Sequence, residues 1–334
     1  TYQKTPLSSH LIYLEHNMAS PIKSKYMKAI AHLGALLTAS AWGASFLCTK
    51  VLMIDGGFTP VEMYVYRFAM AYLLLLVFTF RKILSNNWRD EALFLLCGVC
   101  AGSLYFITEN YALQNTSTAN VSLLGSISPL FTAAIMALVF RTKVGAGVVI
   151  GSIVAFSGVA CVIFSGGDGF VIKPTGDLLA LSASLSWAIY SIAVKRLIPT
   201  YSGLFITRKL FFYGVVTALP LLFWQQAATG SPWHLRLLFD ISHPQLLLNF
   251  LFLVVFCSLL AYLIWNEVMR VLGPVATNNY LYLQPLVTMI AAYFVLGEKI
   301  FPLGYVGCLL IIGGLVLADK LKFNPGRQAQ RRKM

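Results

Sequence analysis

The sequence is poor in charge, above all in negative charge. Only 11% of the 334 residues are charged, and 12 Asp and Glu stand against 25 Lys and Arg. In soluble domains about a quarter of the residues are charged. At the same time 58% of the residues are hydrophobic, and the mean hydropathy is +0.75. This composition excludes an ordinary soluble protein and predicts one integral membrane unit.

The sequence also lacks the patterns of a metal, disulfide or nucleotide site. All six Cys lie inside apolar runs, and Cys97 and Cys100 have no second pair to complete a zinc site. The five His form no metal-binding pattern. The segment GAGVVIG lacks the spacing of a nucleotide loop, and neither a Walker A nor a GxSxG motif is present. We therefore expect no enzyme activity, no metal and no cofactor.

Ten apolar runs are long enough to cross a membrane as helices, which takes about 20 residues each. They cover residues 30–52, 61–80, 91–112, 117–140, 144–164, 177–197, 203–224, 245–269, 274–296 and 301–319. The net charge of +13 does not indicate nucleic-acid binding, because the cations lie in the gaps between the runs. The positive-inside rule instead predicts a multi-pass protein with both termini cytoplasmic, which places Arg208 and Lys209 on the cytoplasmic side. The cytoplasmic segments would be residues 1–29 and the basic tail, 320–334.

Two parts of the sequence repeat. A Trp precedes a Lys by eight residues in AWGASFLCTKVL and again in SWAIYSIAVKRL; these are Trp42 and Trp187. Further along, Pro129 and Pro285 lie 156 residues apart among matching neighbours. Each repeat holds five runs, so the second enters the membrane from the opposite side, as in many secondary transporters. We expect an all-α integral membrane fold of ten transmembrane helices, two inverted five-helix repeats around a central cavity, at residues 30–164 and 177–319.

The cavity is predicted where matching interruptions fall near the middle of the membrane. A proline inside a helix bends it and frees a carbonyl that protein or water must satisfy, and paired interruptions indicate a transport site. The candidate cavity residues are Trp42, Ser126, Ser128, Pro129, Trp187, Tyr190, Tyr282, Gln284 and Pro285. The alternative is that they are packing kinks and core aromatic residues. Three amides at the starts of the fourth and ninth runs either cap helices or line a vestibule: Asn120, Asn278 and Asn279.

Charged residues in the runs are a second group of candidates, because charge inside a membrane is costly unless it has a partner or a function. Near the outer level lie Lys50, Arg67 and Glu109, which predict an ion-paired gate. Near the inner ends lie Lys195 and Glu267, which predict a matching inner contact. In both groups, snorkelling of the side chain to the interface is the alternative.

Four longer motifs carry a family resemblance. They are ASAWGASFLCTK and ALQNTSTANVSLLGSISPLFTAAIMALVF in the first repeat, and LSASLSWAIYSIAVKRL and GPVATNNYLYLQPLVTMIAAYFVLGEKI in the second. From about residue 30 to 319 the chain resembles the EamA family of the drug/metabolite transporter superfamily. The family usually ends its fourth helix with Gly-Glu, where this chain has Arg141 and Thr142. The resemblance implies a basket of ten helices that exports metabolites or drugs across the bacterial cytoplasmic (inner) membrane.

These features predict a secondary transporter that exports small metabolites such as amino acids or drug-like compounds by alternating access. A nucleotide-sugar or phosphorylated-sugar antiporter is the alternative, and it would need Lys50 and Arg67 to face the cavity. A membrane-embedded transferase is a more distant alternative. The expected partners are a small-molecule substrate and membrane lipid, with no nucleic acid, and the protein is expected to be a monomer or a homodimer.

Overall fold

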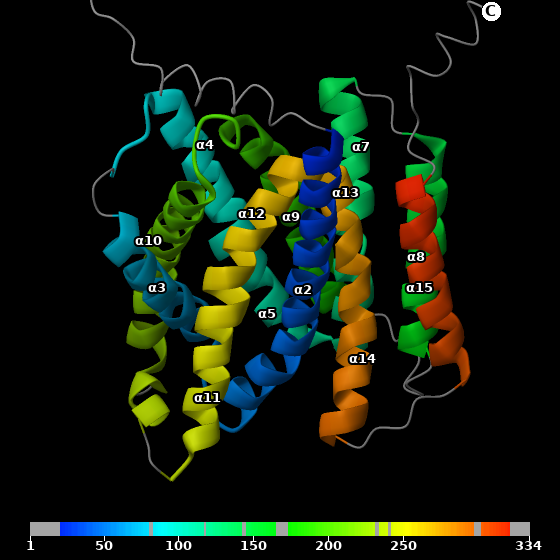
Figure 1. Cartoon of the computed structure of the whole chain (residues 1–334). Helices are drawn as coiled ribbons and strands as arrows, with labels where there is room; N and C mark the ends of the chain where they lie inside the picture. The colour runs from blue at the N-terminus through cyan, green and yellow to red at the C-terminus, as the bar shows by residue number, and fades with distance from the viewer. Residues whose placement is uncertain are drawn as a thin grey trace, which may run out of the picture.

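The computed structural model is all-helical over the residues that it describes. These are residues 21–79, 83–116, 118–141, 145–164, 173–230, 234–239, 242–296 and 302–320. Taken along the chain, the helices form ten rods, one for each predicted apolar run (Figure 1). The fold prediction is therefore confirmed at the level of helix number and order.

Six rods are single helices and four are interrupted. The single helices are α2 (Pro21–Ile54), α3 (Pro60–Thr79), α8 (Ala146–Phe164), α9 (Pro174–Leu197), α10 (Gly203–Thr229) and α15 (Pro302–Lys320). The interrupted rods are α4 (Trp88–Gly98), η1 (Val99–Ser103) and α5 (Leu104–Asn115); α6 (Thr118–Gly125) and α7 (Ser128–Phe140); α11 (Pro244–Phe252), η3 (Leu253–Leu260) and α12 (Ala261–Leu272); and α13 (Pro274–Asn278), η4 (Asn279–Tyr282) and α14 (Leu283–Leu296). A short 3-10 helix, η2 (His234–Phe239), lies between the seventh and eighth rods.

Eight of the described rods are long and apolar enough to cross a membrane. The ninth rod is divided into three short pieces, and the apolar part of the tenth, Pro302–Ala318, is shorter than the rest. Prolines begin several rods, because the first turn of a helix needs no backbone N–H from them. The first rod begins at Pro21, earlier than predicted. Its added turns are polar but contain Lys, Met and Ala, which favour helix.

The two groups of five rods make equivalent contacts. In the first group α2 packs against α12 and α14 of the second, and in the second group α9 packs against α5 and α7 of the first. The second rods, α3 and α10, pack on each other, as do the fifth rods, α8 and α15. Successive rods run in alternating directions (Figure 1). Because five rods precede α9, it starts at the opposite end from α2, and the repeats are inverted.

Two ends of the molecule are distinguished below. At the upper end of Figure 1, α3 and α9 finish and α4 and α10 begin. At the lower end, α2 and α5 finish and α3 and α9 begin. Hydrogen bonds agree with this assignment, since Tyr201 and Asp90 meet at the upper end and Thr116 and Asp177 meet at the lower end.

The pair of α8 and α15 stands at the edge of the molecule, beyond α14 (Figure 1). Its helices touch through Gly151 and Gly158 of α8 and Gly307 and Gly314 of α15. A Cβ atom at any of the four would overlap backbone of the other helix. The small residues therefore permit the close helix packing that is typical of membrane proteins.

Candidate functional site

Trp42 of α2 and Trp187 of α9 meet at the centre of the molecule. Their ring centroids lie 5.3 Å apart in an edge-to-face arrangement, a favourable aromatic geometry. Trp42 also packs on Trp265 of α12, with centroids 4.9 Å apart, and Trp187 packs on Tyr105 of α5, with centroids 5.2 Å apart. The repeated Trp of one copy thus contacts the repeated Trp of the other.

The third and eighth rods each contain a π-helical segment, η1 and η3, at equivalent places. A π segment disturbs the regular pairing of carbonyls, and in a membrane each freed carbonyl needs another donor. The Trp42 Nε1–H donates to the carbonyl of Cys257 in η3, at 2.8 Å. The Ser186 hydroxyl donates to the carbonyl of Cys100 in η1, at 2.7 Å. The first rod of each repeat is therefore tied to the π segment of the other repeat.

The fourth and ninth rods are broken rather than bent. The helix α6 ends at Gly125, and α7 begins at Ser128 with Pro129 in its first turn. In the ninth rod the 3-10 segment η4 separates α13 from α14, and Pro285 lies in the first turn of α14. The sequence predicted proline bends in continuous helices. Instead each proline lies in the first turn of a new helix, where a backbone N–H is not needed for an intrahelical bond.

A cavity lies between the two Trp residues and the break in the fourth rod. Its lining residues are Trp42, Ser45, Phe46, Arg67, Tyr105, Phe106, Glu109, Gly125, Ser128, Trp187, Tyr262, Leu281 and Gln284. A neighbouring cavity shares five of these residues and extends the space toward the lower end, along Thr49, Met63, Tyr64, Phe68, Asn110 and Leu113. The predicted candidates that line this space are Trp42, Arg67, Glu109, Ser128, Trp187 and Gln284.

Five candidates lie outside the lining of this cavity: Ser126, Pro129, Tyr190, Tyr282 and Pro285. The Tyr190 hydroxyl is buried and donates to Oδ1 of Asn266 in α12, at 2.9 Å. Tyr282 packs in an apolar cluster with residues of α8 and α15. The Ser126 hydroxyl donates to the carbonyl one turn before it in α6. Position along the sequence predicts depth in the membrane but not the direction of a side chain around its helix.

Arg67 and Glu109 line the same cavity, yet no ion pair joins them within the described part of the chain. The Nε–H of Arg67 donates to the hydroxyl of Ser258 in η3, at 2.6 Å. Glu109 accepts a hydrogen bond from the Tyr105 hydroxyl, at 2.7 Å. Lys50 is exposed and does not line the cavity. The predicted three-residue ion pair is therefore not formed in this structure.

The predicted inner contact between Lys195 and Glu267 is not formed either. Lys195 lies over the ring of Phe140, with Nζ 4.9 Å from the centroid. Glu267 pairs with Arg270 on its own helix, at 3.0 Å, and accepts the backbone N–H of Gly203, at 3.2 Å. The two residues share a height in the membrane, but each finds a partner on a different neighbour.

The predicted vestibule asparagines behave differently from one another. Asn278 is fully buried, and its Nδ2 donates to the hydroxyls of Thr132 and Ser191, at 2.7 and 3.0 Å. It connects three rods and neither caps a helix nor lines the cavity. Asn279 is 6% exposed, and its Oδ1 has no hydrogen-bond partner. The side chain of Asn120 lies outside the described residues.

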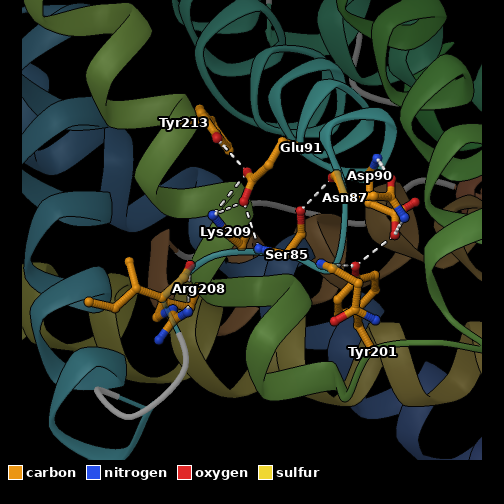
Figure 2. Close-up of polar contacts among 10 residues, drawn as sticks. Ser85, Asn87, Asp90, Glu91, Tyr201, Arg208, Lys209 and Tyr213 are labelled. Carbon is orange, nitrogen blue, oxygen red and sulfur yellow. Dashed lines mark hydrogen bonds and ion pairs between the residues drawn. The ribbon is translucent and has the colours of Figure 1, made fainter.

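Charged residues at the upper end form a buried cluster (Figure 2). Lys209 of α10 donates to both carboxylate oxygens of Glu91 in α4, at 2.7 and 2.9 Å. The Tyr213 hydroxyl and the backbone N–H of Ser85 donate to the same carboxylate, at 2.5 and 2.7 Å. Lys209 is only 4% exposed. The sequence predicted only the membrane side of Lys209; the structure shows that its side chain is buried and joins the third rod to the seventh.

A second set of contacts at this end surrounds the ion pair (Figure 2). The Tyr201 hydroxyl donates to Asp90 Oδ2 at 2.7 Å and accepts the backbone N–H of Asn86 at 2.8 Å. Burial first, and then the bond to Asp90, raise the pKa of the Tyr201 phenol. The buried Arg208 guanidinium donates to the backbone carbonyls of Thr79 and Ile83. Together these contacts close the upper end between the second, third, sixth and seventh rods.

This cluster leaves a weak signal in the sequence. Glu91 begins the third apolar run, and Arg208 and Lys209 lie inside the seventh. Opposite charges at the start of two runs that begin at the same end are compatible with an ion pair, which we did not predict. Hydropathy alone cannot show that these rods are neighbours.

At the lower end a different carboxylate is buried. Glu62 of α3 is fully buried and lies 2.8 Å from Nδ1 of His234 in η2. It also accepts hydrogen bonds from the Tyr66 hydroxyl and Gln226 Nε2, both at 3.2 Å. Glu62 thereby attaches η2 to α3 and α10. Among the described residues, no group of three or more His, Cys, Asp or Glu could hold a metal ion.

Comparison with known proteins identifies the family of the chain. The model of the EamA-like transporter family matches residues 29–164 and again 174–318. The two matches coincide with the two groups of five rods. The duplication seen in the sequence and in the helix contacts is thus a repeat of one family unit.

Several proteins of other organisms are similar to this chain over most of their length. An uncharacterized transporter of Archaeoglobus fulgidus is 26% identical over 87% of this chain and 98% of its own. A probable terminal-alkyne amino-acid exporter of Streptantibioticus cattleyicolor is 28% identical over 72% of this chain and 77% of its own. An uncharacterized inner membrane transporter of Salmonella typhimurium, YicL, is 25% identical over 85% of this chain and 93% of its own.

A solved structure shares the fold. A protein crystal structure at 18% sequence identity superposes with a TM-score of 0.68, and the match covers 87% of this chain and 97% of the other. At this identity the likeness concerns the fold alone. It supports the ten-rod arrangement in which the cavity lies.

Proposed function

Because the chain belongs to the EamA-like transporter family, we propose that it exports small organic metabolites, such as amino acids or drug-like compounds, by alternating access. The observation that carries this proposal is a central cavity between inverted repeats, extending toward the lower end while buried polar contacts close the upper end. The amino-acid exporter of Streptantibioticus cattleyicolor is one relative whose name agrees with it.

The inverted repeats explain why a state closed at the upper end and a state closed at the lower end would have similar energies. Each first rod contacts the π segment of the other repeat, and the two Trp residues touch across the centre. If the repeats exchange conformations, the contacts that close the upper end open and equivalent contacts close the lower end. The breaks beside Pro129 and in η4 provide places where the fourth and ninth rods change direction with few hydrogen bonds to lose.

The membrane orientation is part of the proposal. The chain is a multi-pass membrane protein, and the relative YicL is an inner membrane transporter by name. The positive-inside rule supports an upper end that faces the cytoplasm. In this orientation the cavity extends toward the outside, and substrate release would take place from the conformation described here.

The antiporter alternative has less support. It requires several cations at the cavity, because a phosphorylated sugar carries at least one negative charge that needs pairing. Arg67 lines the cavity, but Glu109 lines it too, and Lys50 does not. A transferase is set aside because the family consists of transporters.

Transport is tested with purified protein in vesicles. Vesicles are loaded with a cell metabolite extract, and the released compounds are identified by mass spectrometry against protein-free vesicles. Alternating access is tested by closing the upper end: Asp90→Cys and Tyr201→Cys, in a background without other Cys, are joined by a short bis-methanethiosulfonate, which forms a disulfide with each thiol. We expect release to stop on cross-linking and to return on reduction, whereas each single Cys variant stays active. Release that continues through the cross-linked protein would overturn the mechanism.

A further inference from the structure

The guanidinium of Arg67 has fewer partners than a buried cation needs. Arg67 is 5% exposed and lies seven residues into α3, within the membrane span. Its Nε–H bonds to Ser258, and its Cζ lies 5.1 Å and 5.3 Å from the ring centroids of Phe68 and Phe106. Its Nη2 is buried and has no hydrogen-bond partner. A charge in this position is costly unless a counter-ion completes it.

Glu109 is the complementary group. It accepts one hydrogen bond, from the Tyr105 hydroxyl, and no cation within the described part of the chain lies within ion-pair distance of it. It lines the same two cavities as Arg67. The space therefore has one positive and one negative group on its wall, and neither group neutralises the other by direct contact.

The remaining wall of the cavity is mostly aromatic. Trp42, Phe46, Tyr105 and Trp187 present ring surface to it, and Gln284 adds an amide. Such a wall suits an apolar side chain, while a guanidinium suits a carboxylate, which it binds with two parallel N–H bonds.

We propose that this cavity selects small zwitterions, with the substrate carboxylate on Arg67, its ammonium on Glu109 and its side chain against the aromatic wall. The proposal rests on the transport function proposed above, which already includes amino acids, and it assigns the residues that bind the two charged groups of such a substrate. A zwitterion gives each charged group its counter-charge and brings no net charge into the membrane. A cation would leave Arg67 unpaired, and an anion would leave Glu109 unpaired.

The experiment compares three matched pools in vesicles that contain the purified full chain. The pools are the free L-amino acids, their amides, which keep only the ammonium, and their N-acetyl derivatives, which keep only the carboxylate. We expect the free amino acids to cross at least about tenfold faster than either derivative, since a charged hydrogen-bonded contact is lost in each. Amides or N-acetyl derivatives that cross as fast as the free pool would overturn the proposal.

Variants assign the charges to residues. Arg67→Gln and Glu109→Gln should each slow the free pool about tenfold or more, and Arg67→Lys, which keeps the charge without the planar fork, should recover part of the rate. Lys50→Gln is the matched control, because it removes an exposed cation of the same region and should leave the rate within about twofold. If Arg67→Gln and Glu109→Gln fold with unchanged thermal stability and transport the free pool normally, the proposal is wrong.

The outcomes separate this proposal from the transport function. If no pool crosses but another compound of the metabolite extract does, the zwitterion proposal fails and transport stands. If nothing crosses, both fail. If either Gln variant does not fold, the comparison of the three pools in the unmodified protein decides alone.

Discussion

Two arginines at matching positions of the inverted repeats have different surroundings. Arg67 in α3 and Arg208 in α10 each precede a Tyr by five residues, and the two helices pack on each other. Arg208 donates to two backbone carbonyls at the upper end, whereas Arg67 keeps a buried Nη2 without a partner and faces the cavity. Arg208 thus contributes to the closed upper end, whereas Arg67 lines the cavity.

The interior beside each arginine shows the same contrast. Next to Arg208, a chain of hydrogen bonds runs from Tyr190 through Asn266 to Thr207, at 2.9 Å for each step. Next to Arg67, the cavity occupies the space between α2, α3 and α5. The inverted repeats are therefore similar in fold and unequal in conformation, and this inequality is what a transporter must reverse in each cycle.

Among the variants that test this contrast, replacement of Lys209, the cation that pairs with Glu91 at the closed upper end, should have the largest effect on stability. Lys209→Met leaves the buried Glu91 without its ion pair, so we expect a loss of about 3 kcal/mol from the closed upper end. Thermal unfolding in detergent measures the loss, and maleimide labelling of the buried Cys97 in α4, located by mass spectrometry, reports opening. Lys50→Met, at an exposed position, is the control. Unchanged stability and unchanged Cys97 labelling would show that the ion pair does not hold this end.

An intermediate effect on stability is expected for the two repeated Trp residues, because their indole N–H groups differ in hydrogen bonding. Trp42→Phe leaves the carbonyl of Cys257 without its donor at 2.8 Å, which costs about 1–3 kcal/mol. Trp187→Phe should cost less, because the Trp187 Nε1 lies 3.4 Å from Asn278 Oδ1, which has other partners nearby. Thermal unfolding of the two variants side by side measures the difference. Equal losses would mean that the repeats depend on their Trp residues through ring packing alone.

The smallest effect on stability is expected for the replacement of Tyr201, the phenol at the upper end. Tyr201→Phe removes the bonds to Asp90 and to the Asn86 backbone, at a cost of about 1 kcal/mol. The raised pKa of Tyr201 means that its neutral form is favoured in the folded protein. Its contribution is therefore complete below the ordinary phenol pKa and is lost only when the pH rises through the raised value. The stability difference between Tyr201→Phe and the unmodified protein should stay constant from pH 6 to 9; a difference that shrinks within this range would contradict the assignment.

Much of the fold follows from the sequence, because hydropathy reports directly on membrane spans. The ten rods, their order and the duplication were all predicted from apolar runs and from the repeated Trp and Pro. The π segments were not predicted, since η1 and η3 contain neither a proline nor a distinct pattern. The breaks at Pro129 and in η4 were predicted as bends. A proline in the sequence shows that one backbone N–H is missing, but it does not show where the preceding helix ends.

The site was predicted less completely, for a geometric reason. Position along a rod predicted the two Trp residues near the middle of the membrane and Arg67 and Glu109 near its outer level, and all four line one cavity. Position along a rod does not give the direction of a side chain or the identity of the neighbouring rod. Tyr190 therefore lies away from the cavity, and Lys195 and Glu267 do not meet.

The glycine-packed pair of α8 and α15 also has a consequence in time. The two helices are the last rods of their repeats, so a long stretch of chain separates the end of α8 at Phe164 from the start of α15 at Pro302. At a synthesis rate of about 5–20 residues per second, roughly 7–28 seconds pass between the appearance of the two. For that interval the glycine face of α8 has only lipid beside it. The newly made first repeat thus has an uncovered contact surface, which α15 covers only after most of the second repeat has been made.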